Sequence, residues 1–255
     1  MAAEIAAWRT TLPERSRYGI VQAFRQALEA AIRWGDMERN PAKLAGANPP
    51  PTPRGVRSFA WPELEALALE LGPVYGPMIR FAAATGMRPE EWGALERQHV
   101  DRARGVARVV RTHVEGRTKA YGKTSASLRE VPLSARAASA LDDVPARLDT
   151  QLVFYGRRGA HVNLRNFRRR EWTPALEAAG IPPRRIYDVR STFASDALAA
   201  GVSVFERARI MGTSVRMIER RYGTLLQGSG DAIRAKLDAH SDRSGQERAI
   251  ATKVV

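Results

Sequence analysis

Apolar residues recur at helical spacing along much of this chain. The first such stretch covers residues 18–33 and predicts an amphipathic helix, which Gly35 ends. Its apolar positions are Ile20, Val21, Phe24, Leu28 and Ile32. A turn is predicted to begin at Asn40-Pro41. The proline-rich residues 48–53 can continue neither a helix nor a sheet, so they predict a stiff linker at a domain boundary.

Three more helices are predicted after this linker. Ser58 can cap the first one, which has Pro62 near its first turn and ends at Gly72-Pro73. The second is apolar and covers residues 78–86, and the third covers residues 89–95. Residues 1–48 are therefore expected to form one helical unit, with the linker at 49–57, a main domain at 58–228 and a tail at 229–255.

Residues 99–133 follow a different pattern. Short β-branched runs at 106–110 and 129–133 are separated by glycine and polar residues, which predicts a small antiparallel sheet. Another short strand is predicted at 152–155. Helices are predicted again after Ser134 and near 163–179. Three more helices are predicted within 188–222, and Asp188 is expected to cap the first of them. A last short helix is predicted at 232–237. The whole pattern predicts an α+β fold that is mainly α-helical, with one small antiparallel β-sheet.

Charge narrows the choice of partner. Lysine and arginine number 41 against 27 acidic residues, which gives a net charge of +14 and a pI near 11.0. Most of the excess is arginine, whose planar guanidinium grips phosphate oxygens in pairs. A polyanion is therefore the expected partner, and nucleic acid is the commonest one, although a merely basic surface has the same composition.

Other features exclude several classes of protein. The chain has no cysteine, so it has neither a disulfide framework nor a cysteine nucleophile nor a thiolate zinc site. No apolar run reaches membrane-spanning length and the N-terminus does not resemble a signal peptide, so a cytoplasmic protein is expected. The four histidines are scattered and there is no phosphate-binding glycine loop, so neither a metal nor another cofactor is predicted.

Two of four candidate segments lie in the first half of the main domain. Gly86 permits a sharp turn that places Arg88 at the start of the next helix, where backbone dipoles and a guanidinium share one anion-binding spot. Glu91 follows three residues later on the same face and could hold Arg88 in place. Lys123 is expected at a hairpin turn ahead of the 129–133 strand. Taken alone, each basic residue is more often a solvated surface cation.

The other two segments lie near the end of the domain. Tyr187 and Arg190 are three residues apart and can point toward one patch at a helix start. Thr213 or Ser214 can cap a short helix that carries Tyr222 on its apolar face. Such a face is normally core, so Tyr222 alone would be read as structural.

Together, the four segments resemble the tyrosine recombinase (phage integrase) family in order and spacing. The sequence Thr-Gly-Met-Arg-Pro-Glu-Glu at 85–91 is similar to its first motif, and Lys123 stands where a hairpin lysine precedes an Arg-x-Val-Pro-Leu strand. Tyr187 to Arg190 matches the His-x-x-Arg box, and Met-Gly-Thr at 211–213 matches the Leu-Gly-His box, with Tyr222 nine residues later. The resemblance covers about residues 18–226 and implies the tyrosine recombinase catalytic fold for the main domain.

The resemblance also implies a function. A site-specific recombinase or integrase would cut and rejoin duplex DNA through a 3′-phosphotyrosyl intermediate, without a metal or ATP, as a homotetramer on attachment-site DNA near the bacterial nucleoid. Residues 1–48 would be the remnant of a DNA-clamping, core-binding domain, and the tail could dock on a neighbouring copy. The catalytic residues implied are Tyr222 (nucleophile), Arg88, Arg190, Lys123 (proton donor to the 5′-oxygen), Tyr187 and Thr213, with Glu91 in support.

Two departures from the family pattern leave other functions open. Tyr187 and Thr213 stand where the family usually has histidine or tryptophan, and they offer hydroxyl donors but no imidazole. One alternative is a DNA-binding relative in which Tyr222 is idle. A type IB topoisomerase-like enzyme would use the same residues without pairing two sites. A helix-turn-helix regulator would leave the spacing of the basic residues to chance.

Overall fold

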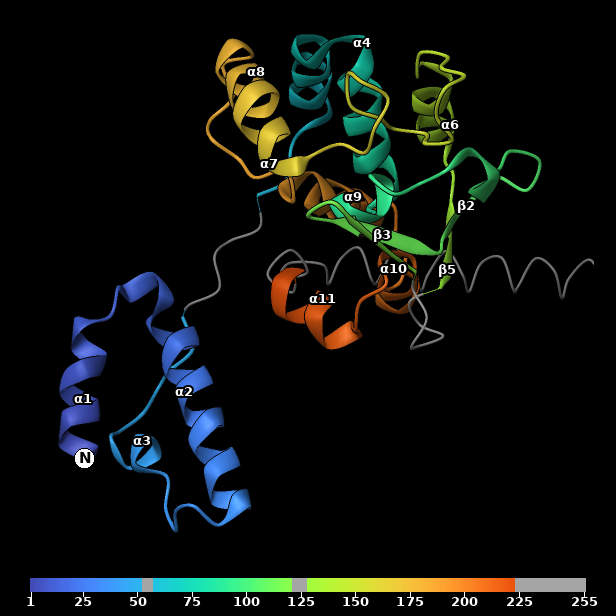
Figure 1. Ribbon diagram of the computed structural model, residues 1–255. Coiled ribbons are helices and arrows are strands. Elements are labelled where there is room, and N and C mark those ends of the chain that lie inside the picture. The colour runs from blue at the N-terminus through green and yellow to red at the C-terminus, as the bar shows by residue number, and fades with distance from the viewer. Residues whose placement is uncertain (52–56, 121–127, 223–255) are drawn as a thin grey trace, which may run out of the picture. The chain divides into compact units, whose positions relative to one another are not determined.

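The computed structural model describes residues 1–51, 57–120 and 128–222, with side chains up to Arg220. The chain forms two compact units, Met1–Arg54 and Gly55–Val255 (Figure 1). The predicted hairpin residue Lys123 and the predicted tail helix at 232–237 lie outside the described residues.

The first unit is entirely helical where it is regular. Its helices are α1 (Ala2–Thr11), α2 (Glu14–Trp34) and α3 (Pro41–Leu44). Helix α2 is longer than predicted and ends at Gly35, which adopts the left-handed conformation with φ of 85°. Asn40 caps a helix rather than beginning a turn, because its side chain accepts a hydrogen bond from Ala42 N at 3.0 Å. Trp8 packs edge-to-face on Phe24, with ring centroids 5.3 Å apart.

Helix α4 (Trp61–Thr85) is the central element of the second unit, and it packs against α6 (Ala135–Asp142), α8 (Thr173–Ala178) and α9 (Asp188–Ala199). The predicted break at Gly72 is confirmed as a kink, with φ of 70° and ψ of −174°. The predicted cap at Ser58 is wrong. The helix begins at Trp61, because Glu63 Oε2 accepts a hydrogen bond of 2.8 Å from Ala60 N.

Three short strands form the main antiparallel sheet, in the order β1, β2, β5. They are β1 (Val100–Asp101), β2 (Val106–Val109) and β5 (Arg129–Pro132). The predicted pairing of 106–110 with 129–133 is confirmed, and the opposed residues Ala107 and Val131 are both fully buried. A separate hairpin of β3 (Arg111–Val114) and β4 (Arg117–Ala120) was not predicted. All four residues of β4 are exposed, so the hairpin has no apolar alternation that would indicate it.

The strand predicted at 152–155 is wrong. These residues are buried, but their ladder is a single bridge between Leu152 and Glu96, so the apolar run reflects tertiary packing. Helix α5 (Pro89–Trp92) is shorter than the predicted 89–95. The helix predicted at 163–179 is interrupted, because α7 (Leu164–Phe167) and α8 flank a π-helical segment, η2 (Arg168–Trp172). Pro174, which lacks an N–H, is the second residue of α8 and lies two residues beyond that segment.

The last three predicted helices are confirmed as α9, α10 (Val204–Met211) and α11 (Val215–Tyr222). Asp188 begins α9 but does not cap it, because its carboxylate accepts from Arg185 N at 2.9 Å and pairs with the Arg185 guanidinium. A 3₁₀ turn, η1 (Arg97–His99), precedes β1.

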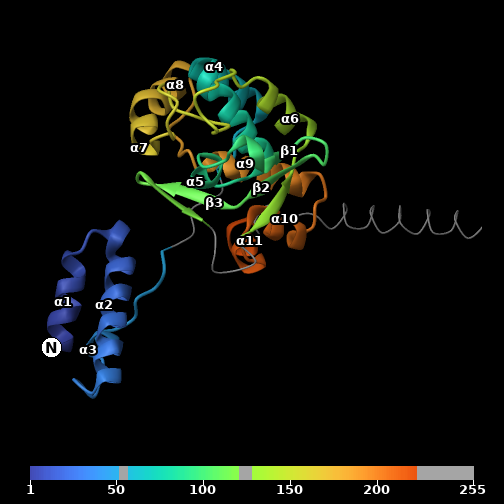
Figure 2. The same cartoon turned by 45° about the vertical axis from the view of Figure 1, so that its right-hand side comes forward.

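The sheet of the second unit lies between α4, α6 and α8 on one side and α10 and α11 on the other (Figures 1 and 2). The fold is therefore α+β and mainly helical, as predicted. Within the described residues, no helix is both long enough and apolar enough to cross a bilayer.

Candidate active site

Arg88 lies where α4 gives way to α5. Gly86 ends α4 in the left-handed conformation, with φ of 62°. A Cβ at Gly86 would lie 2.4 Å from Cδ1 of Phe193 on α9, so the turn requires glycine for both its conformation and its close packing. Arg88 then donates twice to Glu91, from its backbone N to Oε2 at 2.8 Å and from Nη1 to Oε1 at 2.7 Å.

Arg190 is buried on α9 rather than exposed at the surface, with 3% of the residue accessible. Its Nη1 donates to the Gly86 carbonyl oxygen at 2.5 Å, and its Nη2 donates to the Met211 carbonyl oxygen at 2.7 Å. The guanidinium carbon also lies 5.9 Å from the ring centroid of Tyr187. Burial lowers the pKa of Arg190, and the charges of Arg88 and Arg129 lower it further, so these three cations share one neighbourhood.

The C-terminal end of α10 is where the arginines meet. The last carbonyl groups of a helix lack partners within it and carry partial negative charge. Each of three successive carbonyls here accepts from a different arginine: Ile210 from Arg129 Nε at 2.7 Å, Met211 from Arg190, and Gly212 from Arg88. We call this set the arginine clamp. Segments far apart in the sequence are thereby tied to the chain that leads into α11.

Arg129 in the clamp was not predicted as a site residue. Its Nη1 and Nη2 donate to Glu91 Oε1 and Oε2 at 3.0 Å and 2.6 Å, and the two side chains are 4% and 0% exposed. Burial raises the pKa of Glu91, but the hydrogen bond and charge of Arg129 and the charge of Arg88 lower it to about 2. One signal could have indicated this residue: strand alternation places Arg129 on the same face as buried Val131.

The structure brings some of the other predicted residues to this place. Thr213 and Arg88 line one groove of about 1500 Å³, together with Arg129. Ser214, rather than Thr213, caps α11, because its Oγ accepts from Met217 N at 3.3 Å. Helix α11 packs on α10 and ends at Tyr222, whose side chain lies outside the described part of the structure, as does Lys123.

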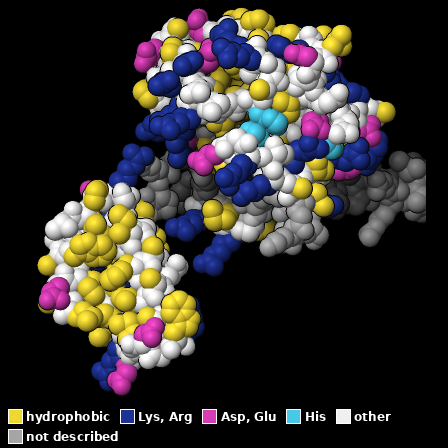
Figure 3. All heavy atoms as spheres, in the orientation of Figure 1, with side chains coloured by type: hydrophobic (Ala, Val, Ile, Leu, Met, Phe, Trp, Pro, Cys, Tyr) yellow, Lys and Arg dark blue, Asp and Glu magenta, His cyan; other side chains and the backbone are white. Residues whose placement is uncertain are grey.

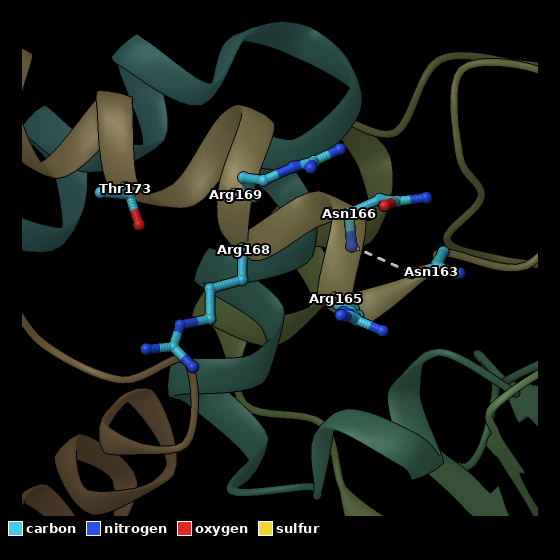
Figure 4. A pocket seen from close by; sticks show the side chains of 6 residues that line it. All are labelled: Asn163, Arg165, Asn166, Arg168, Arg169 and Thr173. Atoms are coloured by element: carbon cyan, nitrogen blue, oxygen red, sulfur yellow. Dashed lines mark hydrogen bonds between the residues drawn. The ribbon is translucent and has the colours of Figure 1, made fainter.

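A second basic feature lies on the helical segment from α7 to α8. A pocket of about 600 Å³ is lined by Asn163, Arg165, Asn166, Arg168, Arg169 and Thr173. In Figure 4 the Arg165 and Arg168 side chains leave the helix in different directions, and the Asn163 side chain caps it by accepting from Asn166 N. Arg165, Arg168 and Arg169 take part in no ion pair among the described residues. Lysine and arginine side chains also gather along the left edge of the second unit in Figure 3.

Two of the four histidines are not scattered in space. The rings of His113 and His161 stack 3.8 Å apart at an angle of 8°, and burial lowers the pKa of both. In the described ranges, no cluster of three or more His, Cys, Asp or Glu side chains has metal-binding geometry.

Comparison with known proteins gives the family. The model of the phage integrase family matches residues 73–227, which is more than half of the chain. The chain belongs to the phage integrase family. The predicted resemblance is thus confirmed, and the matched region contains Arg88, Glu91, Arg129, Arg190 and Tyr222.

One relative by sequence and two solved structures with a similar fold illustrate the comparison. A Mycobacterium tuberculosis protein, provisionally named prophage phiRv2 integrase, is 26% identical over 84% of this chain, and the chain spans 59% of that relative's length. The fold is similar to that of the Tn1549 transposon integrase in complex with circular intermediate DNA, with a TM-score of 0.74 and 14% identity over 93% of this chain and 85% of that one. It is also similar to lambda integrase (75–356) bound as a dimer to a COC′ core site, with a TM-score of 0.64 and 16% identity over 86% and 78%.

Proposed function

We propose that this family member is a site-specific recombinase that cuts and rejoins duplex DNA through a 3′-phosphotyrosyl intermediate on Tyr222. One observation carries the proposal: Arg88 and Arg190, from distant segments, converge on the α10 end that leads into the helix of Tyr222. Family membership and the net charge of +14 support a DNA partner.

In the proposed reaction, the Tyr222 phenolate attacks a backbone phosphorus and forms the phosphotyrosyl bond, as the bond between phosphorus and the 5′-oxygen breaks. The barrier lies in the negative charge on the non-bridging oxygens, which Arg88 and Arg190 would neutralise. Tyr187 and Thr213 would donate hydroxyl hydrogen bonds to the same oxygens, and Lys123 would protonate the leaving 5′-oxygen. Glu91 would hold Arg88 in its orientation. The phosphotyrosyl bond would conserve the energy of the broken linkage, so rejoining would need no ATP.

The wider roles belong to the same proposal. Residues 1–48 would be part of a core-binding domain that clamps DNA, and residues 229–255 would dock on a neighbouring copy. Both would act in a homotetramer that pairs two attachment sites in the bacterial cytoplasm, on nucleoid DNA. The basic pocket around Arg165 and Arg169 would contact DNA phosphates.

A cleavage assay tests the chemistry. A nicked duplex carrying candidate attachment sites from DNA flanking the gene is incubated with the protein and run on a denaturing gel. We expect a protein–DNA adduct from the unmodified protein and from the Tyr155→Phe control, whose hydroxyl bonds Pro145 O away from the clamp. Tyr222→Phe should bind the same DNA and form no adduct. DNA binding without any adduct would favour an idle relative, and relaxation of arbitrary plasmids would favour a topoisomerase.

A further inference from the structure

Arg129, like Arg88, donates hydrogen bonds both to Glu91 and to a carbonyl at the end of α10. Three of its nitrogens have partners: Nε donates to Ile210 O, and Nη1 and Nη2 donate to the two oxygens of Glu91. The distances are 2.7, 3.0 and 2.6 Å, and the side chain is 4% exposed. Three of the five N–H groups of this guanidinium are thus engaged inside the protein, on the two partners Glu91 and Ile210.

The partners of Arg129 are the two parts of the site that must be aligned. Glu91 holds Arg88 through a bond of 2.7 Å to Nη1. Ile210 lies two residues before Gly212, where the chain turns into α11, and a Cβ at Gly212 would lie 2.7 Å from Arg129 Nη1. Arg129 therefore contacts both the support of an arginine and the turn before the tyrosine helix.

We propose that Arg129 is a positioning residue, which sets the orientation of Arg88 through Glu91 and the path of the chain toward Tyr222 through Ile210. The inference rests on the proposed function for its effect on cleavage, but the geometry it describes is independent of chemistry. A lysine cannot replace this arginine, because one ammonium group cannot bind both carboxylate oxygens and a separate carbonyl as the planar fork does.

The chain offers a matched control. Arg104 also makes a two-bond pair with a glutamate of β5, Glu130, at 2.9 Å for both bonds. That pair is largely exposed, at 59% and 42%, and it contacts neither α5 nor the end of α10 through any hydrogen bond among the described residues. Exposed pairs contribute little to stability. A change at Arg104 thus removes the same type of contact without touching the clamp.

The experiment compares Arg129→Met, Arg129→Lys and Arg104→Met in the full chain. Single-turnover cleavage of the nicked duplex, DNA affinity and backbone hydrogen–deuterium exchange are measured for each. We expect cleavage to fall by about 10²-fold in Arg129→Met, because a misplacement of about 1 Å has that effect, while affinity changes by less than about threefold. Arg129→Lys should recover part of the rate. Exchange of peptides covering 208–218 should be faster in both Arg129 variants and unchanged in Arg104→Met.

The two readouts separate the failures. Equal cleavage and equal exchange in the Arg129→Met and Arg104→Met proteins would overturn the positioning role. If the unmodified protein forms no adduct, the proposed function is wrong, and hydrogen–deuterium exchange alone then tests Arg129. Faster exchange at 208–218 in the Arg129 variants would support the positioning role, and unchanged exchange would overturn it. If Arg129→Met does not fold, Arg129→Lys carries the same comparison, and a lysine variant that cleaves at the full rate would overturn the proposal.

Discussion

Arg190 on α9 donates a hydrogen bond of 2.7 Å to the carbonyl oxygen of Met211, the last residue of α10. Its other Nη donates to Gly86 O, so one buried guanidinium joins the ends of α4 and α10. The same residue is therefore both a structural tie and the proposed phosphate ligand.

Replacing Arg190 with lysine should impair both roles. A single ammonium group cannot reach the two carbonyls that the planar fork spans, and it loses the paired contact to phosphate oxygens. We expect Arg190→Lys to reduce adduct formation by about 10²-fold or more and to lower the melting temperature. Arg157→Lys is the control, because Arg157 pairs with Glu171 at an exposed place. Full activity in Arg190→Lys would remove this residue from the proposed chemistry.

Glu91 should make the stability of the protein depend on acid pH. Its pKa is about 2 in the folded protein against 4.5 for the unperturbed group. A depressed pKa contributes stability that is fully present above pH 4.5 and is lost as pH falls toward 2. The difference corresponds to roughly 3 kcal/mol. Urea denaturation at several pH values should show Glu91→Gln less stable than the unmodified protein at pH 6, with the gap narrowing below pH 4. A gap independent of pH would contradict the assigned cause.

Two glycines provide a matched test of packing at the clamp. Gly180 and Gly212 both have positive φ, at 67° and 59°, so alanine strains the backbone at either. A Cβ at Gly180 meets nothing within 4 Å, whereas one at Gly212 approaches Arg129. Gly180→Ala should lower the free energy of unfolding by about 1 kcal/mol and leave DNA cleavage unchanged. Gly212→Ala should lower the free energy of unfolding by more than this and should also slow DNA cleavage. Thermal melting measures the first effect and the adduct assay measures the second. Identical behaviour of the two variants would show that the contact with Arg129 is unimportant.

The basic pocket should contribute to DNA affinity through phosphates. Arg165→Gln with Arg169→Gln should weaken binding to all duplexes and reduce the steepness of the salt dependence by about 0.9 per lost phosphate contact. Arg102→Gln is the control, since its guanidinium already pairs with Asp142 at 2.9 Å. Fluorescence anisotropy across a salt series measures the slope. An unchanged slope would place the pocket outside the DNA interface.

Local signals allowed much of the fold and part of the site to be predicted. Gly86, with an arginine two residues on, marks a turn between helices in the sequence itself. Helices α10 and α11 follow clear apolar spacing, whereas α9 also buries polar side chains such as those of Ser191 and Thr192. The proposed role of Arg129 depends on contacts with Glu91 and Ile210, which are distant in sequence. An arginine at this position therefore does not by itself indicate a site residue. The prediction of a strand at 152–155 was wrong for a related reason. Tertiary packing, and not a strand ladder, accounts for the apolar residues there.

The arginine clamp also bears on how three like charges coexist before any anion arrives. Guanidiniums that share one neighbourhood repel one another, and burial strengthens that repulsion. Glu91 offsets one positive charge, and the peptide oxygens of residues 210–212 serve as internal counter-ions for the rest. The backbone carbonyls thus hold the three guanidinium groups close together in the absence of DNA. A phosphodiester that binds here would meet arginines already in place, and none of these three side chains would need to be ordered from solvent on binding.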